Sequence, residues 1–211
     1  MAQYWTSSQF IDYFAANYLG PSRFGFFLGS GASFDSGIPT GGKLVDLWLA
    51  EMMRADSDEE ASPRDWCTAD RLGIAGFDCE RRAEFYPQVF GRRFHTRDEG
   101  RREIQRQIAG KEPSVGYVIL ACILSDTRHN IVVTTNFDTL AADALMLFFQ
   151  KVSLLCGHES IAQYLDPEAE YPAIVQIHGN VLLDPINDEA GTSMLASGWS
   201  RNFSARSACT R

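Results

Sequence analysis

The stretch Phe24-Gly25-Phe26-Phe27-Leu28, followed directly by Gly29-Ser30-Gly31-Ala32-Ser33, decides the fold. A short run that is apolar at almost every position is typical of a strand covered on both faces, as in a parallel sheet. Glycines just after such a strand let backbone amides approach a phosphate closely. The segment departs from G-x-G-x-x-G at Phe34 and lacks a Gly-Lys-Ser/Thr ending, which excludes a P-loop. A simple tight turn remains a competing interpretation.

Two further apolar runs end in polar residues. Ile131-Val132-Val133 leads into Thr134-Thr135-Asn136-Phe137-Asp138, and Ile174-Val175-Gln176-Ile177 leads into His178-Gly179-Asn180. Open α/β sheets bind ligands at the carboxyl ends of their strands, so we expect the three segments to form one nucleotide site. Helix capping by Thr135, Asn136 or Asp138 is the alternative for the second segment, and it explains one residue but not the whole cluster.

The pattern of elements predicts an α/β fold with a Rossmann-like, doubly wound parallel sheet. Strands are expected at residues 24–28, 131–134, 152–155 and 173–177, alternating with helices. We expect one nucleotide-binding domain over residues 1–186, with a small helical insertion at about residues 55–112. Residues 187–211 are rich in Ser, Ala, Gly and Arg without a clear period, which indicates an irregular tail and a domain truncated or altered at its end.

Apolar spacing also predicts which helix faces point inward. A first helix is expected to start at Ser7 or Ser8 and to turn Phe10, Ile11, Phe14 and Tyr18 to the core. A second, over residues 43–53, is expected to bury Leu44, Leu47 and Trp48. A third, over residues 114–124, is expected to bury Val115, Val118, Ile119 and Cys122.

Composition excludes several classes of protein. Of the 211 residues, 45% are hydrophobic and 22% charged, which is ordinary for a globular chain. The net charge of −8 argues mildly against a nucleic-acid partner. No apolar stretch reaches the ~20 residues of a membrane span, and the N-terminal residues lack signal-peptide features, so we expect a cytoplasmic protein without a membrane partner. The five cysteines contain no C-x-x-C, which argues against a zinc knuckle or a disulfide framework.

Taken together, the three segments resemble the sirtuin superfamily, whose pattern is Gly-Ala-Gly-x-Ser with Ser-Gly-Ile-Pro, then Thr-Gln-Asn-x-Asp, then His-Gly. The matching residues here are Gly29, Gly31, Ser33, Ser36, Gly37, Ile38, Pro39, Asn136, Asp138, His178 and Gly179. The chain departs from the family's deacylases by having Thr40-Gly41-Gly42 in place of Asp-Phe-Arg and by lacking their four-cysteine zinc module. Its Thr-Thr-Asn-Phe-Asp is similar to bacterial sirtuin-like domains that hydrolyse NAD, often in antiphage defence.

The resemblance implies NAD as the substrate and no metal, because the leaving group is already a cationic pyridinium. Asn136 and His178 would be catalytic: Asn136 would position the attacking water or ribose hydroxyls, and His178 would act as the general base. Asp138 would bind the nicotinamide carboxamide, and amides of the glycine segment would hold the pyrophosphate. The implied NAD contacts are Gly29, Ser30, Gly31, Ala32, Ser33, Gly37, Ile38, Pro39, Thr135 and Asp138.

Three functions follow as hypotheses. The first is an NAD glycohydrolase, which would require a homo-oligomer or a partner defence subunit to control it. The second is an NAD-dependent protein deacylase, and the third is a non-catalytic module that binds NAD or ADP-ribose. The remaining histidines, His95, His129 and His158, are expected at the surface or in loops.

Overall fold

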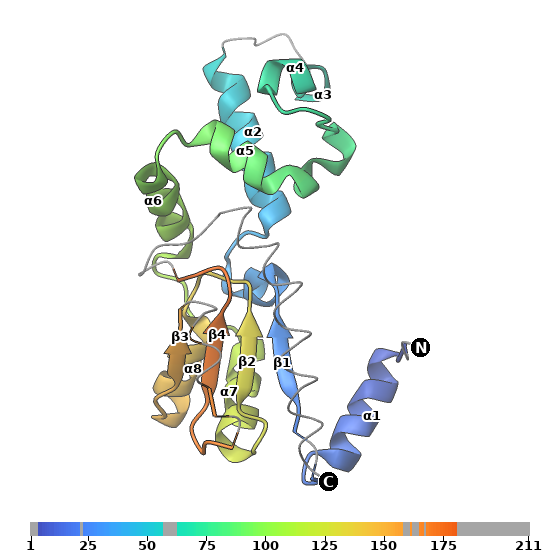
Figure 1. The fold of residues 1–211 in the computed structure, drawn as a ribbon, viewed down its shortest axis with the longest axis vertical. Helices are drawn as coiled ribbons and strands as arrows, with labels where there is room; N and C mark the ends of the chain where they lie inside the picture. Colours follow the sequence, from blue (N-terminus) through green and yellow to red (C-terminus); the bar gives the residue numbers. More distant parts are fainter. Residues whose placement is uncertain are drawn as a thin grey trace. The chain divides into compact units, whose positions relative to one another are not determined.

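The computed structural model describes residues 4–21, 23–56, 63–157, 161, 165–166 and 168–180. Its contacts divide the chain into two compact units (Figure 1). One unit joins Met1–Ile38 to Gly110–Asn180, and the other includes Pro39–Ala109. The expected tail at 187–211 and His158 lie outside the described residues.

The first unit contains a four-stranded, all-parallel sheet with the strand order β1-β2-β4-β3. The strands are β1 (Gly25–Leu28), β2 (Ile131–Thr134), β3 (Leu154–Cys156) and β4 (Ala173–Gln176). The predicted α/β class with a parallel sheet is confirmed, and the arrangement is compatible with a Rossmann-like fold. Leu28 pairs with Thr134, and Thr134 pairs with Gln176, so three strands end level with one another. The three polar segments therefore leave the sheet at the same end, where the strands have their carboxyl termini.

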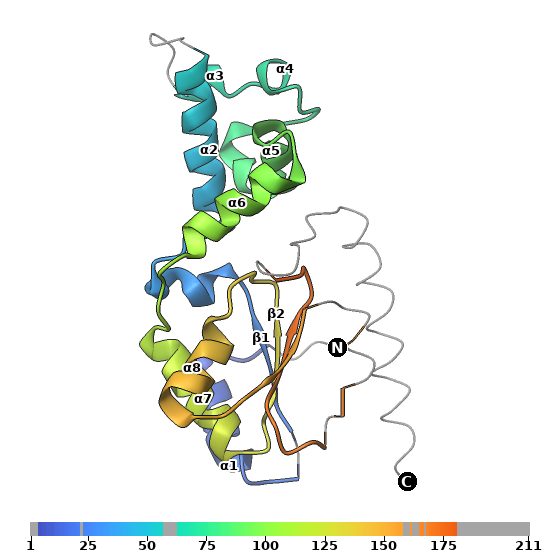
Figure 2. The same cartoon turned by 90° about the vertical axis from the view of Figure 1, so that its left-hand side faces the viewer.

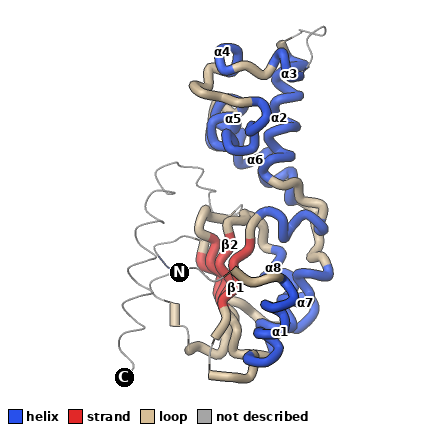
Figure 3. The backbone as a smooth tube through the Cα atoms, turned by 90° about the vertical axis from the view of Figure 1, so that its right-hand side faces the viewer, coloured by secondary structure: helices blue, strands red, loops and turns tan. Residues whose placement is uncertain are grey.

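Helices α7 (Val115–Asp126) and α8 (Leu140–Phe149) pack together on one face of this sheet (Figures 2 and 3). The buried residues of α7 are Tyr117, Leu120, Ala121 and Leu124. The predicted inward face of α7 is wrong, because Val115 is 74% exposed, Ile119 is 57% exposed and Cys122 is also exposed. The helix is apolar on nearly all sides, so its sequence periodicity could not indicate the buried face.

Helix α1 (Ser7–Asn17) packs near the start of β1 through Phe14, whose ring centroid lies 4.9 Å from that of Phe24. The helix is capped by Thr6 rather than by Ser7 or Ser8. The Thr6 hydroxyl accepts from the Gln9 backbone N–H at 3.2 Å, and the Gln9 side chain accepts from the Thr6 N–H at 2.9 Å. This reciprocal pair is a capping box. Phe10, Ile11 and Tyr18, which were predicted to face the core, are exposed.

His129 lies in the loop before β2, as one of its two predicted alternatives has it, but it is fully buried at 0% exposure, so the surface alternative is wrong. Its Nδ1 accepts from the Phe24 backbone N–H at 3.2 Å, and its Nε2 lies 2.7 Å from the Tyr18 carbonyl oxygen. A backbone N–H only donates and a backbone carbonyl only accepts, so the ring carries its hydrogen on Nε2. The neutral imidazole thereby connects the end of α1 to the start of β1.

We expect His129→Ala to lower the free energy of unfolding by about 2–4 kcal/mol, because it opens a cavity and removes the hydrogen-bond partner of two partly buried backbone groups. Urea denaturation measures the loss. His95→Ala is the control, since His95 is exposed and its removal should change stability by less than about 0.5 kcal/mol. A His129 variant as stable as the His95 variant would contradict this role.

The second unit is helical and is organised around Trp48, which is completely buried. Its elements are α2 (Gly41–Ala55), α3 (Pro63–Trp66), α4 (Ala69–Leu72), the 3-10 helix η2 (Cys79–Phe85), α5 (Tyr86–Arg93) and α6 (Arg97–Ile108). The rings of Tyr86, Phe90 and Phe94 each lie 5.3–5.4 Å from the Trp48 ring, centroid to centroid. Leu44 is buried as predicted, whereas Leu47 is 45% exposed.

The helical unit begins earlier in the chain than the predicted insertion at residues 55–112, because the contacts of α2 group it with the helices that follow. Within the described part of the chain, no helix is both long enough and apolar enough to cross a membrane.

Candidate functional site

The glycine segment after β1 forms a 3-10 helix, η1 (Ser30–Ser36). Gly29 precedes the helix in an extended conformation, and Gly37 ends it at φ +81°. Ser33 is 1% exposed, so this short helix directs one hydroxyl into the protein. The left-handed conformation at Gly37 is one that side chains disfavour, which explains this glycine by backbone geometry alone.

Gly29 and Gly31 have no such explanation. Gly29 has a φ of −112°, and Gly31 is not among the residues of positive φ. A Cβ atom built on Gly31 would meet no described atom within 4 Å, and one on Gly29 would come no nearer than 4.0 Å, to Thr135 Oγ1. Neither backbone strain nor packing therefore requires glycine at these positions. An outside group that approaches the backbone would require it.

A buried cluster of polar side chains lies at the carboxyl ends of the strands. Its side chains come from η1, from α7 and from the segment after β2. The Asn136 side-chain N–H donates to Ser33 Oγ at 2.8 Å and to the Gly29 carbonyl at 3.1 Å. Ser33 Oγ lies 2.7 Å from Asp138 Oδ2 and 2.8 Å from the Tyr117 hydroxyl. Because Asn136 and Asp138 are each 7% exposed and Tyr117 only 3%, the cluster is almost closed to water.

The hydrogen bonds of the cluster have one consistent set of directions when Asp138 is ionised. The single hydroxyl hydrogen of Ser33 goes to the carboxylate, so Ser33 accepts from both Asn136 and Tyr117. Burial raises the pKa of Asp138, while donation from Ser33 and from the Leu140 N–H opposes the rise. Burial, aided by the charge of Asp138, raises the pKa of Tyr117 to about 12. Tyr117 is therefore a donor at neutral pH.

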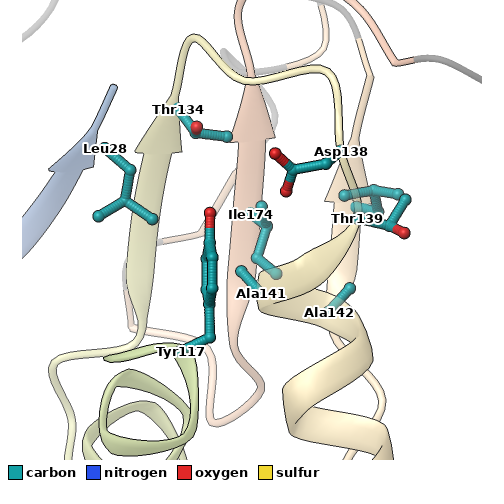
Figure 4. Close-up of a pocket in the computed structure, with 9 residues that line it drawn as sticks. Leu28, Tyr117, Thr134, Asp138, Thr139, Ala141, Ala142 and Ile174 are labelled. Carbon is teal, nitrogen blue, oxygen red and sulfur yellow. The ribbon is translucent and has the colours of Figure 1, made fainter. Parts of the chain in front are cut away.

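A small cavity adjoins the cluster and is lined by Leu28, Tyr117, Thr134, Asp138, Thr139, Ala141, Ala142, Leu155 and Ile174 (Figure 4). The Tyr117 hydroxyl points up into the space between Thr134 and Asp138. The cavity volume of about 10 Å³ is close to what one water molecule needs. A nucleotide needs several hundred Å³, so this cavity is not a nucleotide pocket.

The other predicted site residues have distinct places. Ser30 and Ala32 lie on η1, Ile38 is buried, and Pro39 begins the helical unit. The Thr135 backbone N–H donates to the Leu28 carbonyl at 3.1 Å, which extends the pairing of β2 with β1. The capping alternative holds for Asp138 in part, because its Oδ1 accepts from the Leu140 N–H at 3.2 Å. His178 lies in the turn after β4 and is partly exposed.

Three residues of this region were not predicted as site residues: Tyr117, Gln176 and Asn180. Tyr117 was hidden in an aliphatic helix whose face was assigned wrongly. Gln176 carried a usable signal, because a polar side chain in a buried strand must find hydrogen-bond partners. In the structure it is 0% exposed and donates to the Asp138 carbonyl at 2.6 Å.

No protein-family model matches the chain, and no curated protein matches it. The likeness to sirtuins rests on the three motifs and their order along the chain.

Proposed function

We propose that the protein is an NAD glycohydrolase that cleaves NAD to nicotinamide and ADP-ribose. The observation that carries this proposal is the hydrogen bonding of Ser33 to Asn136 and Asp138. These residues come from two motifs separated by more than one hundred positions, and their side-chain atoms lie 2.7–2.8 Å apart. A cap or a tight turn, each acting locally, does not account for that convergence.

The proposed reaction breaks the bond between C1′ of the nicotinamide ribose and the pyridinium nitrogen. The bonding pair moves to that nitrogen, so nicotinamide leaves neutral and C1′ develops oxocarbenium character. A water positioned by Asn136 adds to C1′, and His178 takes its proton. The products are nicotinamide, ADP-ribose and one proton.

The charge of Asp138 suits a cationic ligand. Its pKa is raised by burial, which means that the described protein compensates the carboxylate incompletely. A pyridinium ring beside Asp138 would favour the ionised form. The same negative charge would stabilise the oxocarbenium character of the transition state. We assign Asp138 to the nicotinamide end of the substrate on this ground.

The resemblance supplies the proposed biological setting, which is bacterial antiphage defence in the cytoplasm. Uncontrolled loss of NAD would kill the cell, so activity would be held off until a trigger arrives. We propose that assembly with further copies of the chain or with a partner defence subunit provides this control.

A second candidate function, binding of NAD or ADP-ribose without turnover, is favoured by one observation. The side-chain N–H groups of Asn136 already donate to the Gly29 carbonyl and to Ser33 Oγ, so both hydrogens have partners inside the protein. Catalysis would require Asn136 to exchange one of these partners for the substrate.

Chromatography of NAD incubated with the full chain tests the proposal, with an acyl-lysine peptide added to half the samples. The hydrolase predicts equal amounts of nicotinamide and ADP-ribose in both halves. Release that requires the peptide would instead establish a deacylase. Tight NAD binding without release, measured by calorimetry, would establish the binding module.

The two kinds of glycine give a further prediction. We expect Gly31→Ala to keep the melting temperature of the wild type and to weaken NAD binding about tenfold, because its new methyl group would occupy the approach to the backbone. Gly37→Ala should instead lose about 1–2 kcal/mol of stability, since alanine disfavours φ +81°. Thermal melts and calorimetry separate the two effects. Unchanged NAD affinity in Gly31→Ala would remove η1 from the proposed site.

A further inference from the structure

Gln176, the last residue of β4, is hydrogen-bonded at both ends of its side-chain amide. Its Nε2 donates to the backbone carbonyls of Asp138 at 2.6 Å and Asn136 at 3.4 Å. Its Oε1 accepts from the Asn180 side-chain N–H at 2.5 Å. Backbone carbonyls only accept, so the nitrogen must face the segment after β2 and the oxygen must face Asn180. The orientation of this buried amide is therefore fixed.

The turn that carries His178 is closed on both sides of the histidine. The Gly179 backbone N–H donates to the Gln176 carbonyl at 3.3 Å, and the side chain of Asn180 bonds that of Gln176. Gly179 has a φ of +86°, which favours glycine. Asn180 is 1% exposed, so water does not compete for its bond. Residues 176–180 form a short closed loop.

Gln176 thus connects the two segments that carry the proposed catalytic groups. Thr134 and Gln176 are register partners on neighbouring strands, so Asn136 and His178 each follow two residues after the paired positions. We propose that Gln176 and Asn180 are positioning residues, which hold the His178 turn in a fixed arrangement with the segment of Asn136 and Asp138. This inference rests on the proposed function for its catalytic consequence, although the coupling of the two segments does not.

A purely structural role would be to satisfy the carbonyls of Asn136 and Asp138. That role needs a donor at position 176 and a partner for the buried Oε1 of Gln176, which Asn180 supplies, but it does not require that a change in one amide alter the segment held by the other. Two linked buried amides stabilise one arrangement only when every polar atom has a partner. Breaking the bond at one amide should therefore change the position of the segment that the other amide holds. This difference makes the inference testable.

Gln176→Glu and Asn180→Asp keep side-chain size and remove the donating N–H when ionised. Asn130→Asp is the matched control. Asn130 is also buried, and its amide also donates to two backbone carbonyls, those of Ala169 at 2.6 Å and Tyr171 at 3.2 Å. It precedes β2 and so lies at the opposite end of the sheet from the site.

In steady-state assays of nicotinamide release, we expect both test variants to lower kcat at least about tenfold and to leave KM for NAD within about twofold of wild type. The control should keep kcat within about twofold, and thermal melts should show comparable losses of stability in all three. A loss of kcat in Asn130→Asp equal to that in the test variants would overturn the inference.

Nuclear magnetic resonance of the full chain gives a readout that does not need activity. We expect Asn180→Asp to shift the side-chain amide signals of Asn136 as well as the ring signals of His178, whereas Asn130→Asp should shift neither. Unchanged Asn136 signals in Asn180→Asp would overturn the coupling. If the wild type released no nicotinamide, the proposed function would fail, and the resonances would still decide whether the two segments are coupled.

Discussion

Asn136→Ala is expected to lower nicotinamide release at least about a hundredfold, which corresponds to ~2.7 kcal/mol of transition-state stabilisation. The side chain lies at the point where the glycine segment and the segment after β2 meet, and it is the proposed means of positioning water at C1′. Its removal also takes a donor from Ser33 Oγ and from the Gly29 carbonyl. We expect this to lower the free energy of unfolding by about 1–3 kcal/mol.

Asn130→Ala separates the two effects, because it removes a comparably buried amide and should destabilise the protein similarly without lowering release. His178→Ala should lose release as fully as Asn136→Ala. Since His178 is partly exposed, its removal should have the smaller effect on unfolding. Chromatography measures release and urea denaturation measures stability. Full activity in either site variant would remove that residue from the mechanism.

Asp138→Asn is expected to abolish release and to make the protein more resistant to rising pH. Burial raises the folded-state pKa of Asp138 above its ordinary value near ~3.9. The folded state then binds this proton more tightly than the unfolded state does. The contribution of Asp138 to stability is fully present below the ordinary pKa, and it is lost as pH rises through the folded-state pKa.

Asparagine has no such titration, so the stability of the variant relative to wild type should increase as pH rises from the ordinary pKa near ~3.9 through the raised folded-state pKa. Replacing a residue that serves function at the expense of stability commonly raises the free energy of unfolding by about 0.5–2 kcal/mol. Urea denaturation across this pH range measures the difference. Asp12→Asn is a suitable control, since Asp12 is exposed on α1 and does not contribute to the shift of the Asp138 pKa. A constant difference between Asp138→Asn and wild type across the range would contradict the assignment.

The sequence specifies the sheet more clearly than the helix faces. β2 matches its predicted bounds because β-branched residues stand between two polar boundaries, His129-Asn130 and Thr135. The inward face of α7 could not be predicted, because Val115 and Ile119 are as apolar as the residues that it buries. Burial there depends on where α8 and the sheet lie, which no local pattern encodes.

The candidate site shows the same division. Ser33, Asn136 and Asp138 could be picked out from the sequence because polar residues after apolar strands have no packing explanation. The burial of His129 could not be foreseen, since its partners are the backbone groups of Tyr18 and Phe24, and backbone groups have no sequence signature. Gln176 is an intermediate case. A polar residue inside an apolar strand indicates a buried hydrogen bond, but the sequence does not show which groups are its partners.

The bond from the Ser114 backbone N–H to Ser36 Oγ, 2.9 Å long, closes the chain where the helical unit departs and returns. Lys111 lies at the same place, because a Cβ atom on Gly37 would stand 3.2 Å from its Nζ. The first unit therefore meets itself across the insertion and does not rely on residues 39–109 to bring β1 to β2. We therefore expect the segment between Ser36 and Ser114 to tolerate insertion, shortening or replacement without displacement of a strand.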